Sequence, residues 1–277
     1  MHDFCPLCSI NKFKKLFSKL IWNKYQIDIV KCINCGFIYN NSKIDKTELN
    51  NFIFQEYYKT KNIGSKIDDR FIRHFTRRAN IHIKYLKKFH LDKFKGKVLD
   101  VGCGAGIYLK EMRNNGWEPF GIEPSEECYN YCVDELGINV ERCLFSEYQS
   151  NNKFDLIYFS HIFDDLPNIN LVLEKCNNLL RKKGKIFIEV PNWNRDKNFK
   201  TVKDGDLIEN KYYFTPNSLR LLLDKNGFKV NKLITYEPIY INTLLQYFKS
   251  PISFIKKIII PKKYKAHIRL VALKNDF

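Results

Sequence analysis

Short apolar runs alternate with helical patterns from residue 96 onward. Each run has the length of a buried strand, and in the segments between runs the apolar residues recur every three or four positions. Regular alternation of this kind predicts an α/β fold with a doubly wound parallel sheet. The expected strands are residues 97–101, 119–122, 139–143, 154–159, 185–190 and 228–235. The expected helices are residues 107–114, a segment ending near 136, and residues 170–180 and 215–226.

Several helix ends can be predicted from local residue types. Residues 181–184 (Arg-Lys-Lys-Gly) are expected to close the helix before them, because basic side chains and glycine suit a helix C-terminus. Thr215 followed by proline predicts a helix start. Residues 266–273 alternate and then become apolar, so we expect a last strand, antiparallel at or near the sheet edge.

The segments on either side of this pattern are less regular. Residues 70–90 predict an amphipathic helix whose apolar side lies on the sheet, formed by Phe71, Phe75, Ile81, Tyr85 and Phe89. Residues 52–58 are aromatic and are expected to form a packing helix. Residues 239–248 are an apolar, aromatic helix candidate. The basic and apolar residues 253–263 favour a lid or packing element over a membrane-surface contact.

The strand at 97–101 leads into a turn of small residues. Gly102, Gly104 and Gly106 allow positive φ and close approach of a ligand to the backbone, and the following helix directs free N–H groups at that ligand. The spacing departs by one residue from a dinucleotide fingerprint. Asp100 would face a pyrophosphate unfavourably, but it could take a cationic amino group.

A second acidic residue ends the next strand. Glu123 follows the glycine turn by about twenty residues, the separation at which a carboxylate binds ribose hydroxyls in nucleotide-binding βαβ units. The alternative is a surface glutamate before a helix capped near Ser125. We favour the ribose role because Glu123 is in register with the glycine turn.

Four of the nine cysteines form two Cys-x-x-Cys pairs, separated by about two dozen residues. Four thiolates in this arrangement suit tetrahedral zinc with no open position, so a structural zinc ribbon is predicted, held by Cys5, Cys8, Cys32 and Cys35. The other cysteines are dispersed, which favours a reduced compartment over a disulfide framework.

Composition narrows the class of protein further. The net charge is +17, which suits nucleic acid or an anionic membrane, but the basic residues are scattered through a chain rich in Lys, Asn and Ile. We therefore favour a lysine-rich surface, and an anionic small substrate would also fit. No leader and no apolar run of about eighteen residues is present, so we expect a cytoplasmic protein that is neither secreted nor membrane-spanning.

The order of these pieces resembles class I S-adenosylmethionine (SAM)-dependent methyltransferases with an N-terminal zinc ribbon, especially nucleotide-sugar C-methyltransferases and related enzymes of sugar and glycan biosynthesis. The motifs are Cys-Pro-x-Cys, Cys-x-x-Cys-Gly-Phe, Asp-Val-Gly-Cys-Gly-x-Gly, Gly-Ile-Glu-Pro-Ser, Phe-Asp-Leu-Ile, Glu-Val-Pro-Asn and Tyr-Phe-Thr-Pro-x-Ser-Leu. The resemblance implies a ribbon at 1–45, a helical linker or lid at 46–95 and a methyltransferase domain at 96–277.

The same resemblance assigns the cofactor and its contacts. It implies that SAM is held by Asp100, Gly102, Gly104, Gly106 and Glu123, with Phe145 flanking adenine. It also implies that residues near Tyr57 and Tyr58 close over the site. Two departures matter: Ser160-His161 replaces a Glu-His pair, and Glu209 is followed by asparagine where the C-methyltransferases carry a catalytic histidine.

Candidate catalytic groups follow strand ends, where open α/β sheets bind ligands. His161 is the first candidate, because an imidazole can act as a base near neutral pH, although a structural histidine is an equal alternative. Asp164, Asp165 and Tyr213 are weaker candidates. A small-molecule acceptor, such as an anionic sugar nucleotide or glycan precursor, is the leading prediction. An RNA methyltransferase, or a binding module without chemistry, is the alternative.

Overall fold

The structure is a computed structural model that describes residues 3–42, 44, 67–87, 96–194, 199, 202–236 and 267–275. The expectations for Tyr57, Tyr58, Phe89 and residues 239–263 lie outside the described residues. No helix among the described residues is long and apolar enough to cross a membrane.

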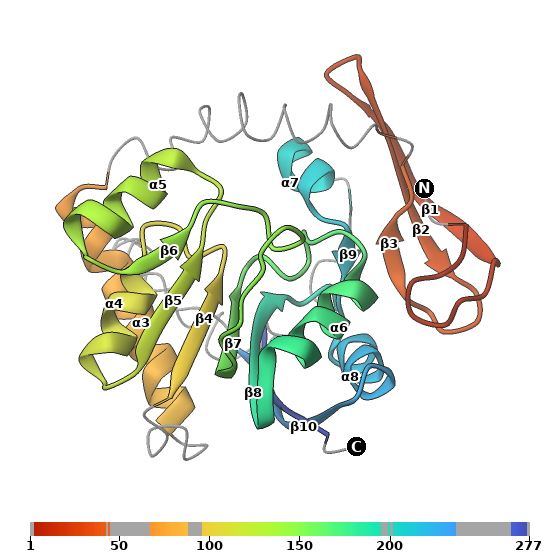
Figure 1. The fold of residues 1–277 in the computed structure, drawn as a ribbon. Helices are drawn as coiled ribbons and strands as arrows, with labels where there is room; N and C mark the ends of the chain where they lie inside the picture. The colour runs from red at the N-terminus through yellow and green to blue at the C-terminus, as the bar shows by residue number, and fades with distance from the viewer. Residues whose placement is uncertain are drawn as a thin grey trace, which may run out of the picture.

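A seven-stranded sheet forms the centre of the molecule, in the order β10-β11-β8-β7-β4-β5-β6 (Figure 1). Its strands are β4 Lys97–Val101, β5 Glu118–Ile122, β6 Asn139–Glu141, β7 Phe154–Ser160, β8 Leu180–Pro191, β10 Phe228–Tyr236 and β11 His267–Lys274. Strands β6, β5, β4, β7 and β8 pair in parallel, and β11 is antiparallel to both β8 and β10. The doubly wound α/β fold is confirmed, and the last strand lies one position in from the edge.

Successive strand residues point to opposite faces of this sheet, and helices cover both faces. Val98 and Tyr158 belong to one buried cluster, whereas Leu99 and Ile157 belong to the other. The first cluster is completed by α3 Asp69–Lys87 and α4 Ile107–Asn114, and the second by α6 Ile169–Leu179 and α8 Pro216–Lys225. Strands buried on both faces explain why each apolar run is almost continuous in the sequence.

Helix α3 confirms the amphipathic prediction but corrects one of its residues. Ile81 is 51% exposed, while the neighbouring turns bury His82, Tyr85 and Leu86. The buried stripe therefore includes a histidine and leaves out an isoleucine. Hydrophobicity alone places Ile81 in the buried stripe. His82 is buried instead, because its ring pairs with the buried carboxylate of Glu189 in β8.

The prediction that residues 181–184 cap a helix is wrong. Helix α6 ends at Leu179, and β8 begins at Leu180 without a glycine cap. Lys183, at φ 60°, adopts the left-handed conformation instead of Gly184. In the pairing with β7, Phe154 lies opposite Leu180 and Leu156 lies opposite Lys185. The basic residues 181–184 therefore form a bulge within β8.

The two ends of α8 agree with the sequence. Thr215 is the N-cap, its hydroxyl accepts from the backbone N–H of Ser218, and the Ser218 hydroxyl accepts from the Thr215 N–H. After Asn226 the chain turns at Gly227, whose φ is 80°.

The N-terminal cysteine segment forms a second, four-stranded antiparallel sheet in the order β1-β2-β3-β9. Its strands are β1 Phe13–Ile21, β2 Tyr25–Cys32, β3 Ile38–Asn40 and β9 Tyr212–Tyr213. Strand β9 comes from the chain between β8 and α8, so residues far apart in sequence complete this sheet (Figure 1). Helix α7, Asp204–Glu209, lies between β8 and β9 in the sequence, and its Leu207 and Ile208 pack against the second sheet.

Candidate active site

The glycine turn after β4 forms an open cradle at the carboxyl edge of the sheet. Gly102, Gly104 and Gly106 have φ values of 70°, 53° and 68°, as predicted from their spacing. The N–H groups of Gly102 and Cys103 donate to the carbonyl of Ile122 at 2.8 and 3.1 Å, which ties the turn to β5. A Cβ at Gly104 would meet no atom within 4 Å, so the top of the turn faces open space that a ligand can fill.

Glu123 points back at this turn from the end of β5. One of its carboxylate oxygens accepts from the Gly104 N–H at 2.8 Å, and the other accepts from the Ser125 N–H at 2.9 Å. Glu123 is only 8% exposed, so it is no surface glutamate, although Ser125 is indeed the N-cap residue of α5 Glu126–Asn130. Burial raises the pKa of Glu123, and the two N–H donors oppose that rise.

Asp100 lies beneath the same turn, one residue before the end of β4. It is buried, and burial together with the nearby Cys132 and Glu123 raises its pKa well above the usual range. A cationic group placed beside Asp100 would favour its charged form. These groups fit a nucleoside that also carries an amino group, because an open glycine turn lies beside two buried carboxyl groups that can accept hydrogen bonds.

Phe145 lies after β6 but points into the core. Its ring is buried and packs edge-on against Phe159 at 5.9 Å, with the Lys175 ammonium 5.4 Å from its centre. An adenine-flanking role for Phe145 stays a prediction.

His161 begins the loop after β7, next to the glycine turn. Its neighbour Ile162 contacts Gly102, where a Cβ would come within 3.1 Å of the isoleucine side chain. The His161 backbone has φ 57°, and its N–H donates to the Glu189 carbonyl at 2.9 Å. The His161 Nε2 atom lies 3.0 Å from Glu189 Oε1, and the side chain is 30% exposed.

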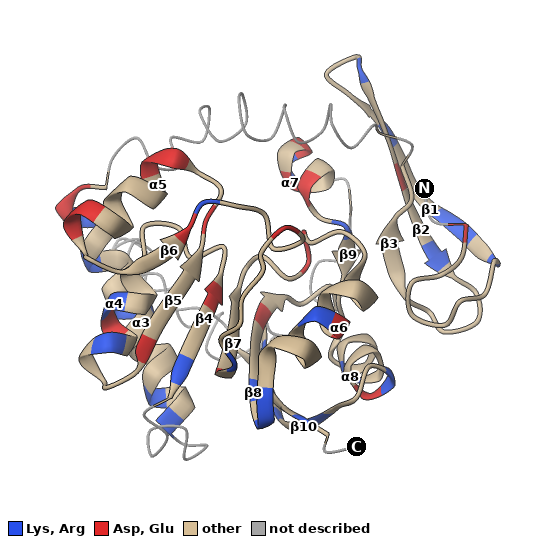
Figure 2. Ribbon diagram, viewed as in Figure 1, with Lys and Arg blue, Asp and Glu red and all other residues tan. Residues whose placement is uncertain are grey.

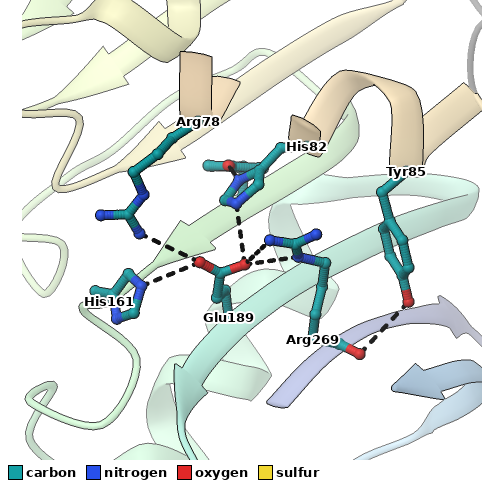
Figure 3. A network of polar contacts seen from close by, with 7 residues as sticks. Arg78, His82, Tyr85, His161, Glu189 and Arg269 are labelled. Atoms are coloured by element: carbon teal, nitrogen blue, oxygen red, sulfur yellow. Dashed lines mark hydrogen bonds and ion pairs between the residues drawn. The ribbon is translucent and has the colours of Figure 1, made fainter. Parts of the chain in front are cut away.

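Glu189 is the centre of a buried polar network that the sequence analysis did not identify (Figure 3). Its Oε1 atom contacts His161 and Arg78, the latter at 3.4 Å. Its Oε2 atom contacts His82 Nε2 at 3.0 Å and the Arg269 guanidinium at 2.5 and 2.6 Å. The available signal was a charged residue inside an apolar strand, at Glu189 in β8 and again at Arg269 in β11.

Opposite effects set the charges within this network. Burial alone would raise the pKa of Glu189, but His82, His161 and Arg269 hold it well below the usual range. Burial lowers the pKa of His82 to about 4, against the pull of Glu189. Glu189 is therefore ionised and His82 neutral near pH 7. The His82 Nδ1 atom is paired with the Tyr158 hydroxyl.

Asp164, three residues after His161, lies close to Tyr213 of β9. Both side chains are buried, and neither Asp164 Oδ1 nor the Tyr213 hydroxyl has a hydrogen-bond partner among the described residues. Burial raises the pKa of Asp164 to about 6, opposed by His161. Burial and the charges of Asp165 and Asp164 also raise the pKa of Tyr213. Asp164 therefore interacts electrostatically with both of the other predicted catalytic residues, His161 and Tyr213.

The edge of the sheet where the parallel strands end is acidic (Figure 2). Helix α5 opens with Glu126 and Glu127, and α7 opens with Asp204 and Asp206. Both helices follow strand carboxyl ends, so their charges lie along the rim of the candidate site. An acidic rim attracts cations and repels phosphates.

The four N-terminal cysteines converge at a separate place, formed by the loop before β1, the last residue of β2 and the loop that follows it. Their Sγ atoms all lie within 4.8 Å of one another, with Cys5 to Cys35 at 3.6 Å and Cys8 to Cys32 at 3.5 Å. Tetrahedral zinc with Zn–S bonds of about 2.3 Å needs sulfurs about 3.8 Å apart. The cluster has the donor type and spacing of such a site.

Comparison with known proteins agrees with this geometry. A family model described as a methyltransferase domain matches residues 71–233. The chain is 27% identical over 114 residues to a ubiquinone biosynthesis O-methyltransferase from Glaesserella parasuis, a match that covers 36% of this chain and 47% of that protein. The chain thus spans about half the length of the curated relatives it matches.

Solved structures share the fold. A SAM-dependent methyltransferase from Archaeoglobus fulgidus is 23% identical with a TM-score of 0.52, over 75% of this chain and 100% of that one. The 1,6-didemethyltoxoflavin-N1-methyltransferase of Burkholderia thailandensis, solved with S-adenosylhomocysteine, is 16% identical with a TM-score of 0.55, over 94% and 100%. At these identities the likeness extends to the architecture alone.

Proposed function

The chain belongs to the family of proteins that carry this methyltransferase domain, and we propose that it transfers a methyl group from SAM to a small-molecule acceptor. The observation that carries the proposal is the pairing of the glycine turn with Glu123 through the 2.8 Å hydrogen bond from Gly104. This pairing supports the proposal because it puts a carboxylate that could bind ribose hydroxyls beside a turn that a nucleoside can approach closely.

In this proposal five residues hold the cofactor. Glu123 accepts hydrogen bonds from the ribose hydroxyls, and Asp100 lies beneath the amino-acid part. Gly104 keeps a side chain out of the cradle, and Gly102 and Gly106 give the turn its left-handed backbone where neighbouring side chains leave little room for a Cβ. When bound, SAM supplies a methyl group that its sulfonium already activates. The protein must therefore align the acceptor and, where necessary, remove its proton.

His161 is the residue that we propose as the proton acceptor. It follows the strand next to the glycine turn, it is partly exposed, and Glu189 holds its ring. Asp164 and Tyr213 are proposed to meet polar hydrogens of the acceptor, because each carries a buried polar atom without a partner among the described residues.

The charges around the site favour a neutral or amine-bearing acceptor. Asp164, whose pKa of about 6 leaves it charged near pH 7, and the acidic first turns of α5 and α7 would repel a diphosphate or an RNA backbone. The relatives named above are described as an O-methyltransferase of ubiquinone biosynthesis and an N1-methyltransferase of a toxoflavin precursor. A sugar nucleotide remains the second candidate, supported by the order of sequence motifs.

For the cysteine cluster we propose one structural zinc ion. All four positions of a tetrahedral ion would be filled by Cys5, Cys8, Cys32 and Cys35, which leaves no site for catalysis.

The test is transfer of labelled methyl from SAM into separated fractions of a source-cell extract. We expect label in uncharged and cationic small molecules. Label in nucleotide sugars would select the second candidate, and label in RNA would overturn the acceptor class. The His161→Gln variant should still bind S-adenosylhomocysteine but should lose about 100-fold or more in transfer rate. Full activity in His161→Gln would exclude His161 as the base.

A further inference from the structure

Glu189 contacts His161 twice. Its carbonyl accepts from the His161 N–H at 2.9 Å, and its carboxylate lies 3.0 Å from the His161 Nε2 atom. His161 has φ 57°, a backbone conformation that a residue with a Cβ adopts only at a cost in free energy. Both the strained backbone and the ring are therefore fixed by one residue of the neighbouring strand.

We propose that Glu189 is a positioning residue that sets the tautomer of His161, so that Nε2 carries the proton and Nδ1 is the basic atom. The proposal rests on the assignment of His161 as proton acceptor for its catalytic meaning, but not for its geometry. An ionised carboxylate can only accept hydrogen bonds, so the nitrogen facing it must be a donor. In a neutral imidazole the other nitrogen then holds the lone pair.

The two carboxylate oxygens of Glu189 have different sets of partners. Oε2 is held by His82 at 3.0 Å and by Arg269 at 2.5 and 2.6 Å, all inside the core. Oε1 faces His161 and Arg78, which are partly exposed. The buried contacts hold the carboxylate in place, and the remaining oxygen directs the reactive ring (Figure 3).

This arrangement also predicts what glutamine would do at position 189. A glutamine side chain offers one acceptor oxygen and one NH₂ donor. The two shortest contacts, at 2.5 and 2.6 Å, come from the Arg269 guanidinium, which can only donate, so the amide oxygen should occupy the Oε2 position. The NH₂ group would then face Arg78, which is partly exposed and can turn to solvent, and His161, whose Nε2 atom must become an acceptor. Glu189→Gln should therefore move the His161 proton to Nδ1.

The experiment is ¹⁵N NMR of histidine-labelled protein saturated with S-adenosylhomocysteine, at a pH where imidazoles are neutral. His161→Gln assigns the His161 signals. We expect the wild type to show protonated Nε2 and unprotonated Nδ1, and Glu189→Gln to show the reverse with binding of S-adenosylhomocysteine changed less than about twofold. Tyr85→Phe, which removes a hydroxyl 3.4 Å from the Arg269 carbonyl, is the matched control and should leave the wild-type tautomer.

A wild-type His161 with the proton on Nδ1 would overturn the proposal, and so would an unchanged tautomer in folded Glu189→Gln. Loss of the buried charge beside Arg269 could prevent Glu189→Gln from folding. In that case the wild-type spectrum alone tests the proposal, because it shows which nitrogen of His161 carries the proton. If His161→Gln keeps full methyl-transfer activity while the tautomer is as expected, the assignment of the base fails and the positioning inference stands.

Discussion

Glu123 illustrates how much a single side chain can contribute at the residue scale. Both of its oxygens already accept backbone N–H groups, so a glutamine there must give up one of these contacts. We expect Glu123→Gln to weaken binding of S-adenosylhomocysteine about 10- to 100-fold, because hydrogen bonds to a charged group are strong. Isothermal titration calorimetry measures the dissociation constant for S-adenosylhomocysteine in each variant. Glu118→Gln, at the other end of the same strand, should bind like the wild type, and equal losses in both variants would refute the cofactor assignment.

Gly106 is constrained both by its backbone and by a neighbour. Its φ is 68°, and a Cβ there would lie 2.7 Å from the Cys132 sulfur. Gly106→Ala should lower the free energy of unfolding by about 2–4 kcal/mol, through left-handed strain and overpacking together. Gly137→Ala, at φ 57° with nothing within 4 Å, isolates the strain and should cost about 1–2 kcal/mol.

Adding Cys132→Ala to Gly106→Ala separates the two contributions. The second substitution removes the sulfur that the new methyl group meets, so the double variant should recover part of the lost stability relative to Gly106→Ala. Urea unfolding of the wild type, Gly106→Ala, Cys132→Ala and the double variant gives the coupling energy between the two positions. Strict additivity of the two substitutions would show that the sulfur does not limit the space at this position.

At the scale of elements, the second sheet depends on both the cysteine cluster and a distant strand. Cys32 is buried at the end of β2, and β3 pairs on one side with β2 and on the other with β9. We expect Cys32→Ser to lose bound zinc and to lower the melting temperature, because structural zinc stabilises the fold that supplies its ligands. Metal analysis and thermal unfolding measure the two effects.

The matched control for Cys32→Ser is Cys143→Ser, a partly buried cysteine outside the cluster. It should keep its full metal content, and a chelator should lower the melting temperature of Cys143→Ser and wild type alike. Stoichiometric zinc retained by Cys32→Ser would contradict the proposed site.

Elements were predictable where one local signal dominated. The strand, glycine turn and helix around Gly102 follow from residue types alone, as do the cap at Thr215 and the strand at 228–236. The error at 181–184 arose because the pairing partner in β7 is not visible in the local sequence, and β8 incorporates these residues. Strand β9 escaped prediction for the same reason, since two residues gain their strand character only from pairing with β3.

At the scale of the whole molecule, the sequence predicted the edge of the sheet where we propose the site, but not the polar network beside it. Glycine spacing predicted the turn that we propose as the cofactor cradle, and strand ends pointed to His161. The Glu189 network joins α3, β7, β8 and β11, and no short-range pattern reveals that Arg78, Glu189 and Arg269 meet. Contacts between distant segments follow from the fold, and periodicity only predicts the elements that the fold brings together.

Among the buried groups, Asp164 and His82 contribute opposite effects to the stability of the whole molecule between pH 4 and 6.5. The raised pKa of Asp164, about 6 against 3.8, contributes stability below pH 4 that is lost as the pH rises to about 6. The depressed pKa of His82, about 4 against 6.5, contributes stability above pH 6.5 that is lost as the pH falls to about 4. In the wild type the two effects partly cancel.

Asp164→Asn should remove the contribution of Asp164 to the pH dependence and leave that of His82. At pH 7 we expect a free energy of unfolding about 1–3 kcal/mol above the wild type, because the variant buries no charge there. On acidification from pH 6.5 to pH 4 the variant should lose stability more steeply than the wild type, since the His82 effect is no longer offset. Urea unfolding across this range tests both statements.

Asp204→Asn is the control for Asp164→Asn, since Asp204 lies at the surface in a pair with Lys19. It should change the stability by less than about 1 kcal/mol and keep the wild-type pH dependence. A destabilised Asp164→Asn at pH 7 would mean that the ionised carboxylate is needed for folding.

The pairing of β3 with β9 sets an order of events during protein synthesis. The ribosome completes β3 about 170 residues before it reaches β9, an interval of about 10–35 s at ordinary elongation rates. Throughout that interval the nascent N-terminal sheet has an unpaired edge at β3, the kind of edge that recruits other chains. Early capture of a metal ion by the cysteines would hold the nascent hairpin in shape until its last strand emerges.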